Sequence, residues 1–225
     1  MRDRPPRFAS VVLDVDSTLS DIEGIDWLAA RRTPELAERV RDLTTRAMAG
    51  EIPIEEVFAS RLEAVAPSRA ELAALGAAYI ACVEPGAKGA LLALGQAGIR
   101  VELVSAGLRP AVSVLADHLK LSDTQVNAVG VQFDASGNFA DFDRTSPLAR
   151  SHGKADLVRS RALPRPILAV GDGITDLEMK TAGAVDAFAA YTGFVHRSTV
   201  VERADHVVES FDAVRALVLG HGLTV

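Results

Sequence analysis

Cysteine is nearly absent from this sequence. The single cysteine, Cys82, cannot form a disulfide within the chain, and such scarcity is typical of a reducing compartment, so we expect a cytoplasmic protein. No basic residue adjoins Cys82 to stabilise a thiolate. We therefore expect Cys82 to be a core residue and not a nucleophile.

An excess of positive charge and long apolar segments are also lacking. The formal net charge of -6 argues against a nucleic-acid partner, because such a partner binds a basic face. No apolar run approaches the roughly 20 residues that a membrane-spanning helix requires. The first apolar stretch stops at Asp14, which is too early for a secretory signal. We expect neither nucleic acid nor a membrane among the partners.

Apolar residues are plentiful, at 48% of 225 residues, and they allow a sizeable core in one or two domains. Four short runs are continuously apolar, which is typical of strands in a parallel sheet covered on both faces. These runs are residues 10–15, 99–105, 127–133 and 165–173. Helical patterns lie between them, for example at 109–121 and 154–163. This alternation predicts an α/β fold with a doubly wound, Rossmann-like parallel sheet.

Three further β segments are predicted. Residues 131–142 carry turn-forming residues at 136–138 between two alternating arms, a pattern typical of a hairpin. Two later apolar pieces, at 185–191 and 205–210, are expected to add edge strands.

Residues 20–83 differ from the rest, because they show helical signals and no convincing strand. Thr33 and Pro34 are a typical helix start, and Gly50 is a suitable end. Ser68 and Glu71 fit a capping box before a second helix. We predict a small helical cap domain at 20–83, inserted after the first strand of a core formed by 1–19 and 84–225.

Polar clusters follow the predicted strands, at the sheet edge where ligands gather in open α/β folds. They are Asp14 with Asp16, Ser105, Lys154, and Asp172 with Asp176. Asp14 and Asp16 are two positions apart, so both carboxylates project from one face of the strand although like charges repel. Each cluster alone has an ordinary interpretation as a helix cap or a turn. All four in this order predict a functional site.

Lys154 opens a predicted helix, where the helix dipole disfavours a cation and favours an anion. A lysine at this position indicates a negative partner nearby. A solvated lysine is the alternative interpretation.

The four clusters resemble the four motifs of the haloacid dehalogenase superfamily of phosphotransferases. The matching segments are "DVDST" at 14–18, "VSAG" at 104–107, Lys154, and "GDGITDLEM" at 171–179. Three longer segments, 13–26, 44–63 and 170–176, are similar to the phosphoserine phosphatase family, and this resemblance covers nearly the whole chain. It implies hydrolysis of O-phospho-L-serine to L-serine and phosphate, a reaction of serine biosynthesis.

The resemblance also implies roles for the core residues. Asp14 is the nucleophile that forms an aspartyl-phosphate, and Asp16 is first an acid for the departing serine oxygen and then a base for water. Mg²⁺ binds Asp14, the backbone carbonyl of Asp16, and Asp172, with Asp176 behind these ligands or acting through a metal-bound water. A phosphomonoester brings a charge of about -2 near pH 7, so the acids alone would repel it. Mg²⁺ and Lys154 offset this charge.

The remaining implied residues surround the substrate. Glu23 is expected to bind the ammonium group and Arg61 the carboxylate, although a solvated cap face is the alternative for both. Met48 and Ile54 close the pocket with apolar surface. The other substrate-binding residues are Ser105, the N–H of Ala106, Thr175 and Arg197.

Two departures from the family pattern occur. Ala106 stands where relatives commonly have glycine, and Ile54 where they commonly have an aromatic residue, so selectivity is expected to be looser. Alternatives therefore stay open: a phosphatase of another small phosphomonoester, or a phosphotransferase from phosphoserine to homoserine. Dehalogenase chemistry has no use for Asp16, and a receiver module needs only about half this length. The chain is expected to be a monomer or a homodimer.

Overall fold

A six-stranded parallel sheet forms the centre of the molecule in a computed structural model that describes residues 5–220. The strand order is β3-β2-β1-β6-β7-β8, and every neighbouring pair is parallel. The strands are β1 (Ser10–Leu13), β2 (Arg100–Leu108), β3 (Val126–Val129), β6 (Ile167–Gly171), β7 (Ala187–Tyr191) and β8 (His206–Val208). This arrangement confirms the predicted doubly wound α/β core.

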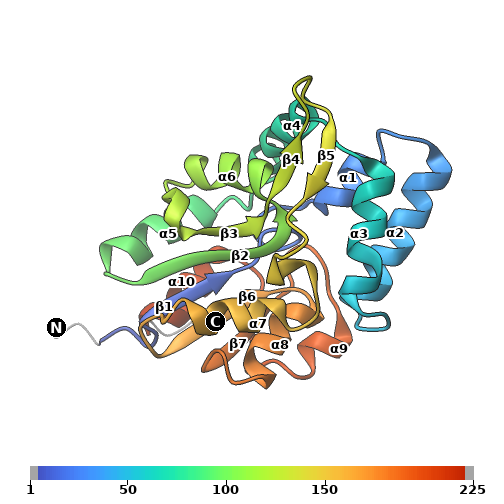
Figure 1. Cartoon of the computed structure of the whole chain (residues 1–225). Coiled ribbons are helices and arrows are strands. Elements are labelled where there is room, and N and C mark those ends of the chain that lie inside the picture. Colours follow the sequence, from blue (N-terminus) through green and yellow to red (C-terminus); the bar gives the residue numbers. More distant parts are fainter. Residues whose placement is uncertain (1–4, 221–225) are drawn as a thin grey trace.

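Helices cover both faces of the sheet. Figure 1 shows α7 and α8 in front of the sheet and α10 behind it, where α10 packs against α5. The helices of this part are α5 (Ala87–Gln96), α6 (Arg109–His118), α7 (Gly153–Ser160), α8 (Ile174–Thr181), α9 (Ser198–Val201) and α10 (Phe211–Leu219). Short 3-10 helices occur at η1 (Asp123–Gln125) and η2 (Pro147–Ala149). Burial on both faces explains why the strands are continuously apolar, as in β1, where every residue is buried.

Two predicted strands differ in detail from the structure. The run at 127–133 was predicted as one strand, but β3 ends at Val129 and β4 (Val131–Phe133) belongs to a separate two-stranded sheet. β4 pairs antiparallel with β5 (Phe139–Phe142), which confirms the hairpin. The prediction of β7 as an edge strand is wrong, because β7 lies between β6 and β8 with all five residues buried. β8 does form the edge.

The segment between β1 and α5 is helical, as its sequence predicts. It contains α1 (Gly24–Ala29), α2 (Pro34–Met48), α3 (Ile54–Val65) and α4 (Arg69–Ala81). Thr33 caps α2 by accepting a hydrogen bond from the Leu36 N–H, and Ser68 forms the predicted capping box with Glu71. Gly50 follows α2 with a φ of 79°, in the left-handed region that favours glycine.

The helical segment is anchored where it begins and ends. Ser20 forms bridges with both Asp16 and Val83, so the incoming and outgoing chains lie side by side. Helices α1, α2 and α3 pack on one another, whereas α4 packs most extensively against α6 (Figure 1). The domain limits at 19/20 and 83/84 stay a prediction, and residues 1–4 and 221–225 of the predicted core lie outside the described residues.

Cys82 is exposed, so the prediction of a core cysteine is wrong. The residue ends α4, where its backbone carbonyl accepts a hydrogen bond from the Asp21 N–H. The backbone is therefore held in place while the thiol faces solvent.

Within residues 5–220, no helix has both the length and the apolar character needed to cross a membrane.

Candidate active site

The predicted polar clusters meet at the carboxyl edge of the sheet. Leu13, the last residue of β1, pairs with Leu103 of β2 on one side and with Val170 of β6 on the other. Asp14 directly follows Leu13, and Asp172 lies two residues after Val170, so the two acids are brought together because parallel neighbours end at the same edge. The shared register converts clusters far apart in sequence into one site.

Three buried carboxylates form a compact group: Asp14, Asp172 and Asp176 each offer an oxygen, and these oxygens lie within 4.8 Å of one another. Oδ1 of Asp14 is buried and has no hydrogen-bond partner among the described residues. Burial, with Glu23 nearby, raises the pKa of Asp172 to about 7. Clustered carboxylate oxygens suit a hard divalent cation, and an added positive charge would relieve their desolvation and mutual repulsion. These residues fit a divalent metal.

Lys154 supplies a positive charge beside this group. Its Nζ lies 3.0 Å from Oδ2 of Asp14 and 2.8 Å from Oδ1 of Asp176. Burial alone would lower the pKa of Lys154, but the two carboxylates outweigh it and raise the pKa above its ordinary value. The helix begins at Gly153, where a Cβ would lie 1.5 Å from the carbonyl oxygen of Pro147. Close packing at Gly153 therefore places the lysine at the start of α7.

Asp176 is held in position by the first turn of α8. Its Oδ2 accepts a hydrogen bond from the Gly173 N–H at 3.1 Å, while Oδ1 accepts from Lys154. A Cβ at Gly171 would lie 2.2 Å from the Asp176 carboxyl carbon. Glycine at 171 is thus required by the close approach of Asp176.

Both oxygens of Asp16 are fixed by hydrogen bonds. Oδ1 accepts from the hydroxyl of Tyr79, and Oδ2 accepts from the Gly24 N–H at 3.1 Å. Burial raises the pKa of Asp16, and the neighbouring Asp14 raises it further. Asp16 therefore holds a proton more readily than an ordinary carboxyl group.

A cavity of about 30 Å³ lies against these carboxylates. Its lining residues are Asp14, Asp16, Glu23, Met48, Ser105, Ala106, Gly107, Lys154, Asp172 and Thr175. Ser105 lies within β2, which extends three residues further than the sequence predicts, and its Oγ accepts a hydrogen bond from the Gly107 N–H at 3.0 Å. Hydroxyl, ammonium and backbone N–H groups around one small space are suited to phosphate oxygens.

A second cavity, of about 40 Å³, adjoins the first on the side of the helical segment. It is lined by Asp16, Glu23, Ile25, Asp26, Thr44, Met48, Ile54, Phe58, Arg61 and Ala106. The Arg61 side chain is buried, and its Nη1 donates to Oγ1 of Thr44. Its Nε is buried without a partner within residues 5–220. An unsatisfied guanidinium donor beside a cavity indicates a site for a carboxylate.

Arg197 joins two acids of the site. Its Nε lies 2.8 Å from Oδ2 of Asp172, and its Nη2 lies 3.3 Å from Oε1 of Glu23. Glu23 also accepts a hydrogen bond from the Ser17 hydroxyl at 2.9 Å. Burial raises the pKa of Glu23, with Asp16 adding to the effect. Arg197 thus reaches the site through its ion pairs and lines neither cavity.

The structure brings all the predicted site residues into one region. Asp176 and Arg197 are the two that line neither cavity, and both contact residues that do. The sequence interpretation missed Tyr79, Thr44 and Asp26. The Thr44 hydroxyl donates a hydrogen bond to Asp26 at 2.5 Å and accepts one from Arg61. No sequence pattern indicated a functional role for Tyr79, because an aromatic residue in an apolar helix is typical of the hydrophobic core.

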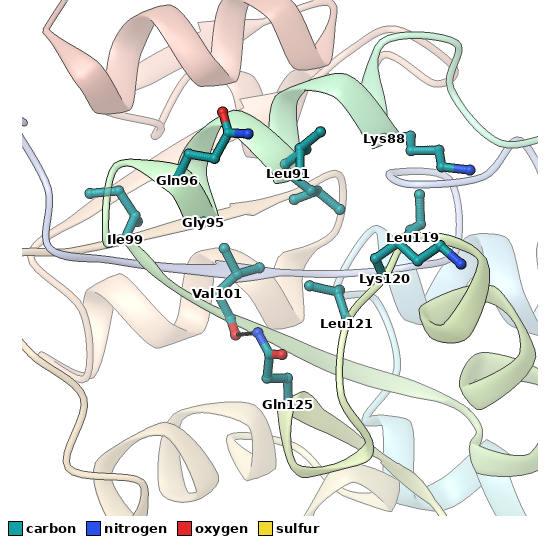
Figure 2. A pocket seen from close by; sticks show the side chains of 11 residues that line it. Lys88, Leu91, Gly95, Gln96, Ile99, Val101, Leu119, Lys120, Leu121 and Gln125 are labelled. Atoms are coloured by element: carbon teal, nitrogen blue, oxygen red, sulfur yellow. Dashed lines mark hydrogen bonds between the residues drawn. The ribbon is translucent and has the colours of Figure 1, made fainter.

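A larger cavity, of about 370 Å³, lies elsewhere (Figure 2). It is bordered by α5, the start of β2 and the chain that follows α6, with Leu91, Ile99 and Val101 among its apolar residues. Among residues 5–220, Lys88 and Lys120 are the only charged residues that line it, and no carboxylate does. The chemistry of the lining residues, and not the volume, therefore identifies the active site.

Comparisons with known proteins agree with this geometry. A family model described as haloacid dehalogenase-like hydrolase matches residues 11–180. Human phosphoserine phosphatase is 33% identical over 205 residues, which cover 90% of this chain and 89% of that protein. The chloroplastic phosphoserine phosphatase of Arabidopsis thaliana is 34% identical over 208 residues, covering 91% and 70%.

A solved structure is similar in fold. A phosphoserine phosphohydrolase-like protein from Francisella tularensis subsp. tularensis SCHU S4 aligns with a TM-score of 0.85 at 22% identity, covering 93% of this chain and 99% of that one. The family model spans most of the chain, and the sequence relatives cover nearly all of it. The chain therefore belongs to the haloacid dehalogenase-like hydrolases, and within them to the phosphoserine phosphatase family.

Proposed function

We propose that this chain hydrolyses O-phospho-L-serine to L-serine and inorganic phosphate. The observation that carries the proposal is the pairing of two adjoining cavities. One is lined by Asp14, Asp16 and Lys154, which suit a phosphoryl group, and the other by Glu23 and Arg61, which suit an ammonium and a carboxylate. Sequence relatives named phosphoserine phosphatase support the same substrate.

The first step forms an aspartyl-phosphate. An oxygen of Asp14 attacks phosphorus, and the bond between phosphorus and the serine oxygen breaks. The serine oxygen keeps the bonding electron pair and takes the proton of Asp16, so L-serine leaves as an alcohol. Lys154, 3.0 Å from Asp14, offsets negative charge at the phosphoryl group.

The second step returns the enzyme to its starting state. Asp16, now a carboxylate, removes a proton from water as the water oxygen attacks phosphorus. The bond between phosphorus and the Asp14 oxygen breaks, and inorganic phosphate is released. Ser105 and the N–H of Ala106 would hold phosphate oxygens throughout, with Thr175 lining the same cavity.

The proposed cation is Mg²⁺, which would be held by Asp14, Asp172 and the backbone carbonyl of Asp16, with Asp176 behind these ligands or acting through a water. When bound, it would supply positive charge that attracts the phosphoryl group and balances the buried acids. Oδ1 of Asp14, which has no hydrogen-bond partner in the described part of the chain, and the short distances among the Asp14, Asp172 and Asp176 oxygens support this choice.

Removing divalent cations with EDTA is expected to lower phosphate release at least 100-fold, because about two negative charges on the substrate would then meet the carboxylates. Adding Mg²⁺ should restore it. Mg²⁺ should also raise the melting temperature of the wild type but not of Asp172→Asn, since ligands stabilise the state that binds them. Full activity in EDTA would contradict the cation proposal.

Substrate selection is proposed to rest on the helical segment, taken as a cap at 20–83. Glu23 would bind the ammonium group and Arg61 the carboxylate, while Met48 and the buried Ile54 would exclude water. The side-by-side chains at Ser20 and Val83 support this division.

A cytoplasmic location stays a prediction from the sequence, since one relative is described as chloroplastic.

The test of the proposed function is kcat/KM with Mg²⁺ for a panel of phosphomonoesters. L-phosphoserine is expected to exceed D-phosphoserine, phosphothreonine, phosphoethanolamine and 3-phosphoglycerate by about 100-fold or more, equivalent to roughly 2.7 kcal/mol. Release of inorganic phosphate with and without added homoserine would distinguish hydrolysis from phosphoryl transfer, because transfer to homoserine frees serine but no inorganic phosphate. A flat panel would leave the phosphatase chemistry intact and refute phosphoserine as the substrate.

A further inference from the structure

Tyr79 contacts the carboxyl group to which the proposed reaction assigns both proton transfers. Its hydroxyl, on α4, donates to Oδ1 of Asp16 across 63 positions of the sequence. The Gly24 N–H donates to Oδ2 of the same carboxyl group at 3.1 Å. One donor at each oxygen restricts rotation of the carboxyl group about its side chain.

The tyrosine is itself firmly held. The side chain is fully buried, and its backbone carbonyl accepts a hydrogen bond from the Ser20 hydroxyl at 3.0 Å. A Cβ at Gly24 would lie 2.3 Å from the Tyr79 Oη, and a Cβ at Gly107 would lie 3.7 Å from it. The phenol therefore occupies a slot that exists because residue 24 has no side chain.

Tyr79 acts through Asp16 and does not touch the substrate space. It lines neither of the two active-site cavities, whereas Asp16 lines both. Among the described residues, Asp16 is the only hydrogen-bond partner of the Tyr79 hydroxyl. The contact is thus a support for the carboxyl group from outside both cavities.

We propose that Tyr79 is a positioning residue that holds the Asp16 carboxyl group in the orientation needed for proton transfer to the departing oxygen. This inference rests on the proposed function. Proton transfer requires a short, aligned contact, so a carboxyl group free to rotate spends less time in the reactive orientation. The hydroxyl of a buried phenol is a rigid donor, because its position is set by the packing of the ring.

Tyr79→Phe removes this single hydroxyl. We expect kcat/KM for phosphoserine to fall about 10- to 100-fold, a part of what general acid catalysis typically contributes, with KM little changed. For p-nitrophenyl phosphate, kcat/KM should fall less than about 3-fold. The kcat/KM for p-nitrophenyl phosphate reports only the steps up to formation of the aspartyl-phosphate, and in these steps nitrophenolate departs without needing a proton.

The matched control is Tyr191→Phe, which removes the hydroxyl of the chain's other tyrosine. Tyr191 is also buried but lies on β7, packed against Phe194 and Phe211. The Tyr191→Phe variant is expected to keep kcat/KM for both substrates within about 2-fold of the wild type. Melting temperatures of both variants separate a loss of folded protein from a loss of rate.

A double-mutant cycle tests whether Tyr79 works through Asp16. In the Asp16→Asn background, Tyr79→Phe is expected to cause no further loss of kcat/KM on phosphoserine, because the acid is already gone. An equal loss on both substrates, or the full loss in the Asp16→Asn background, would overturn the proposal. If the wild type prefers another alkyl phosphate, the proposed substrate fails, and the same comparison with that ester still tests Tyr79.

Discussion

Asp14→Asn is expected to abolish turnover of phosphoserine, with kcat lowered by at least about 10⁴-fold. Loss of a nucleophile typically costs this much or more. The amide of asparagine is a poor nucleophile and cannot form a stable acyl phosphate. The change also removes one of the two carboxylates within 3.0 Å of Lys154 Nζ, while Asp176 remains as its partner. The fold should therefore persist while the chemistry stops.

The measurement is phosphate release over several hours, combined with intact-protein mass after brief exposure to substrate. The wild type should show a fraction carrying one added phosphoryl group, and Asp14→Asn should show none. Asp117→Asn, at an exposed position on α6, serves as a control for loss of a carboxylate. Undiminished turnover by Asp14→Asn would mean that another residue attacks phosphorus.

Arg61→Ala is expected to lower kcat/KM for phosphoserine about 100-fold while changing p-nitrophenyl phosphate less than about 5-fold. A charge-assisted hydrogen bond to a carboxylate is worth about 1.5–3 kcal/mol, or roughly 10- to 150-fold, and the expected loss lies in the upper part of this range because the donor is buried. Nitrophenyl phosphate has no carboxylate to lose. The buried Nε of Arg61, without a partner among the described residues, is the donor expected to serve the substrate.

Asp26 and Thr44 give this prediction a structural basis. Thr44 accepts a hydrogen bond from Arg61 and donates to Asp26, so the guanidinium is held in one orientation. Burial lowers the pKa of Arg61, and Asp26 opposes the shift. Arg39→Ala, which removes an exposed arginine of α2, is the control for net charge. Equal losses on both substrates would remove Arg61 from substrate selection.

The two departures from the family pattern have different structural consequences. Ala106 lines both active-site cavities, so its methyl group takes up space next to the phosphoryl position. Gly107 is retained, and a Cβ there would lie 3.2 Å from Oγ of Ser105 and 3.1 Å from Val112. Ile54 is buried and lines the cavity of Arg61. Residue 107 is thus glycine at a position where a side chain would crowd Ser105.

Much of the fold follows from local sequence patterns. Continuous apolar runs predict the buried strands, and capping residues such as Thr33 and Ser68 mark where helices begin. Such signals are local because a strand or helix buries its side chains at a fixed period. The position of a strand in a sheet depends on distant segments. For this reason local patterns predict neither that β7 lies inside the sheet nor that residues 127–133 divide between two sheets.

The candidate site divides in the same way. The sequence alone determined the catalytic candidates Asp14, Asp16, Lys154 and Asp172. These residues lie at the ends of strands or the starts of helices, and local sequence patterns are sufficient to predict where strands end and helices start. Only the tertiary structure decided that Tyr79 supports Asp16, that Arg197 joins Glu23 to Asp172, and that Cys82 faces solvent. These contacts depend on how α4 and the segment before α9 pack against the core. Packing of distant segments is set by the whole set of buried surfaces, and no short stretch of sequence encodes it.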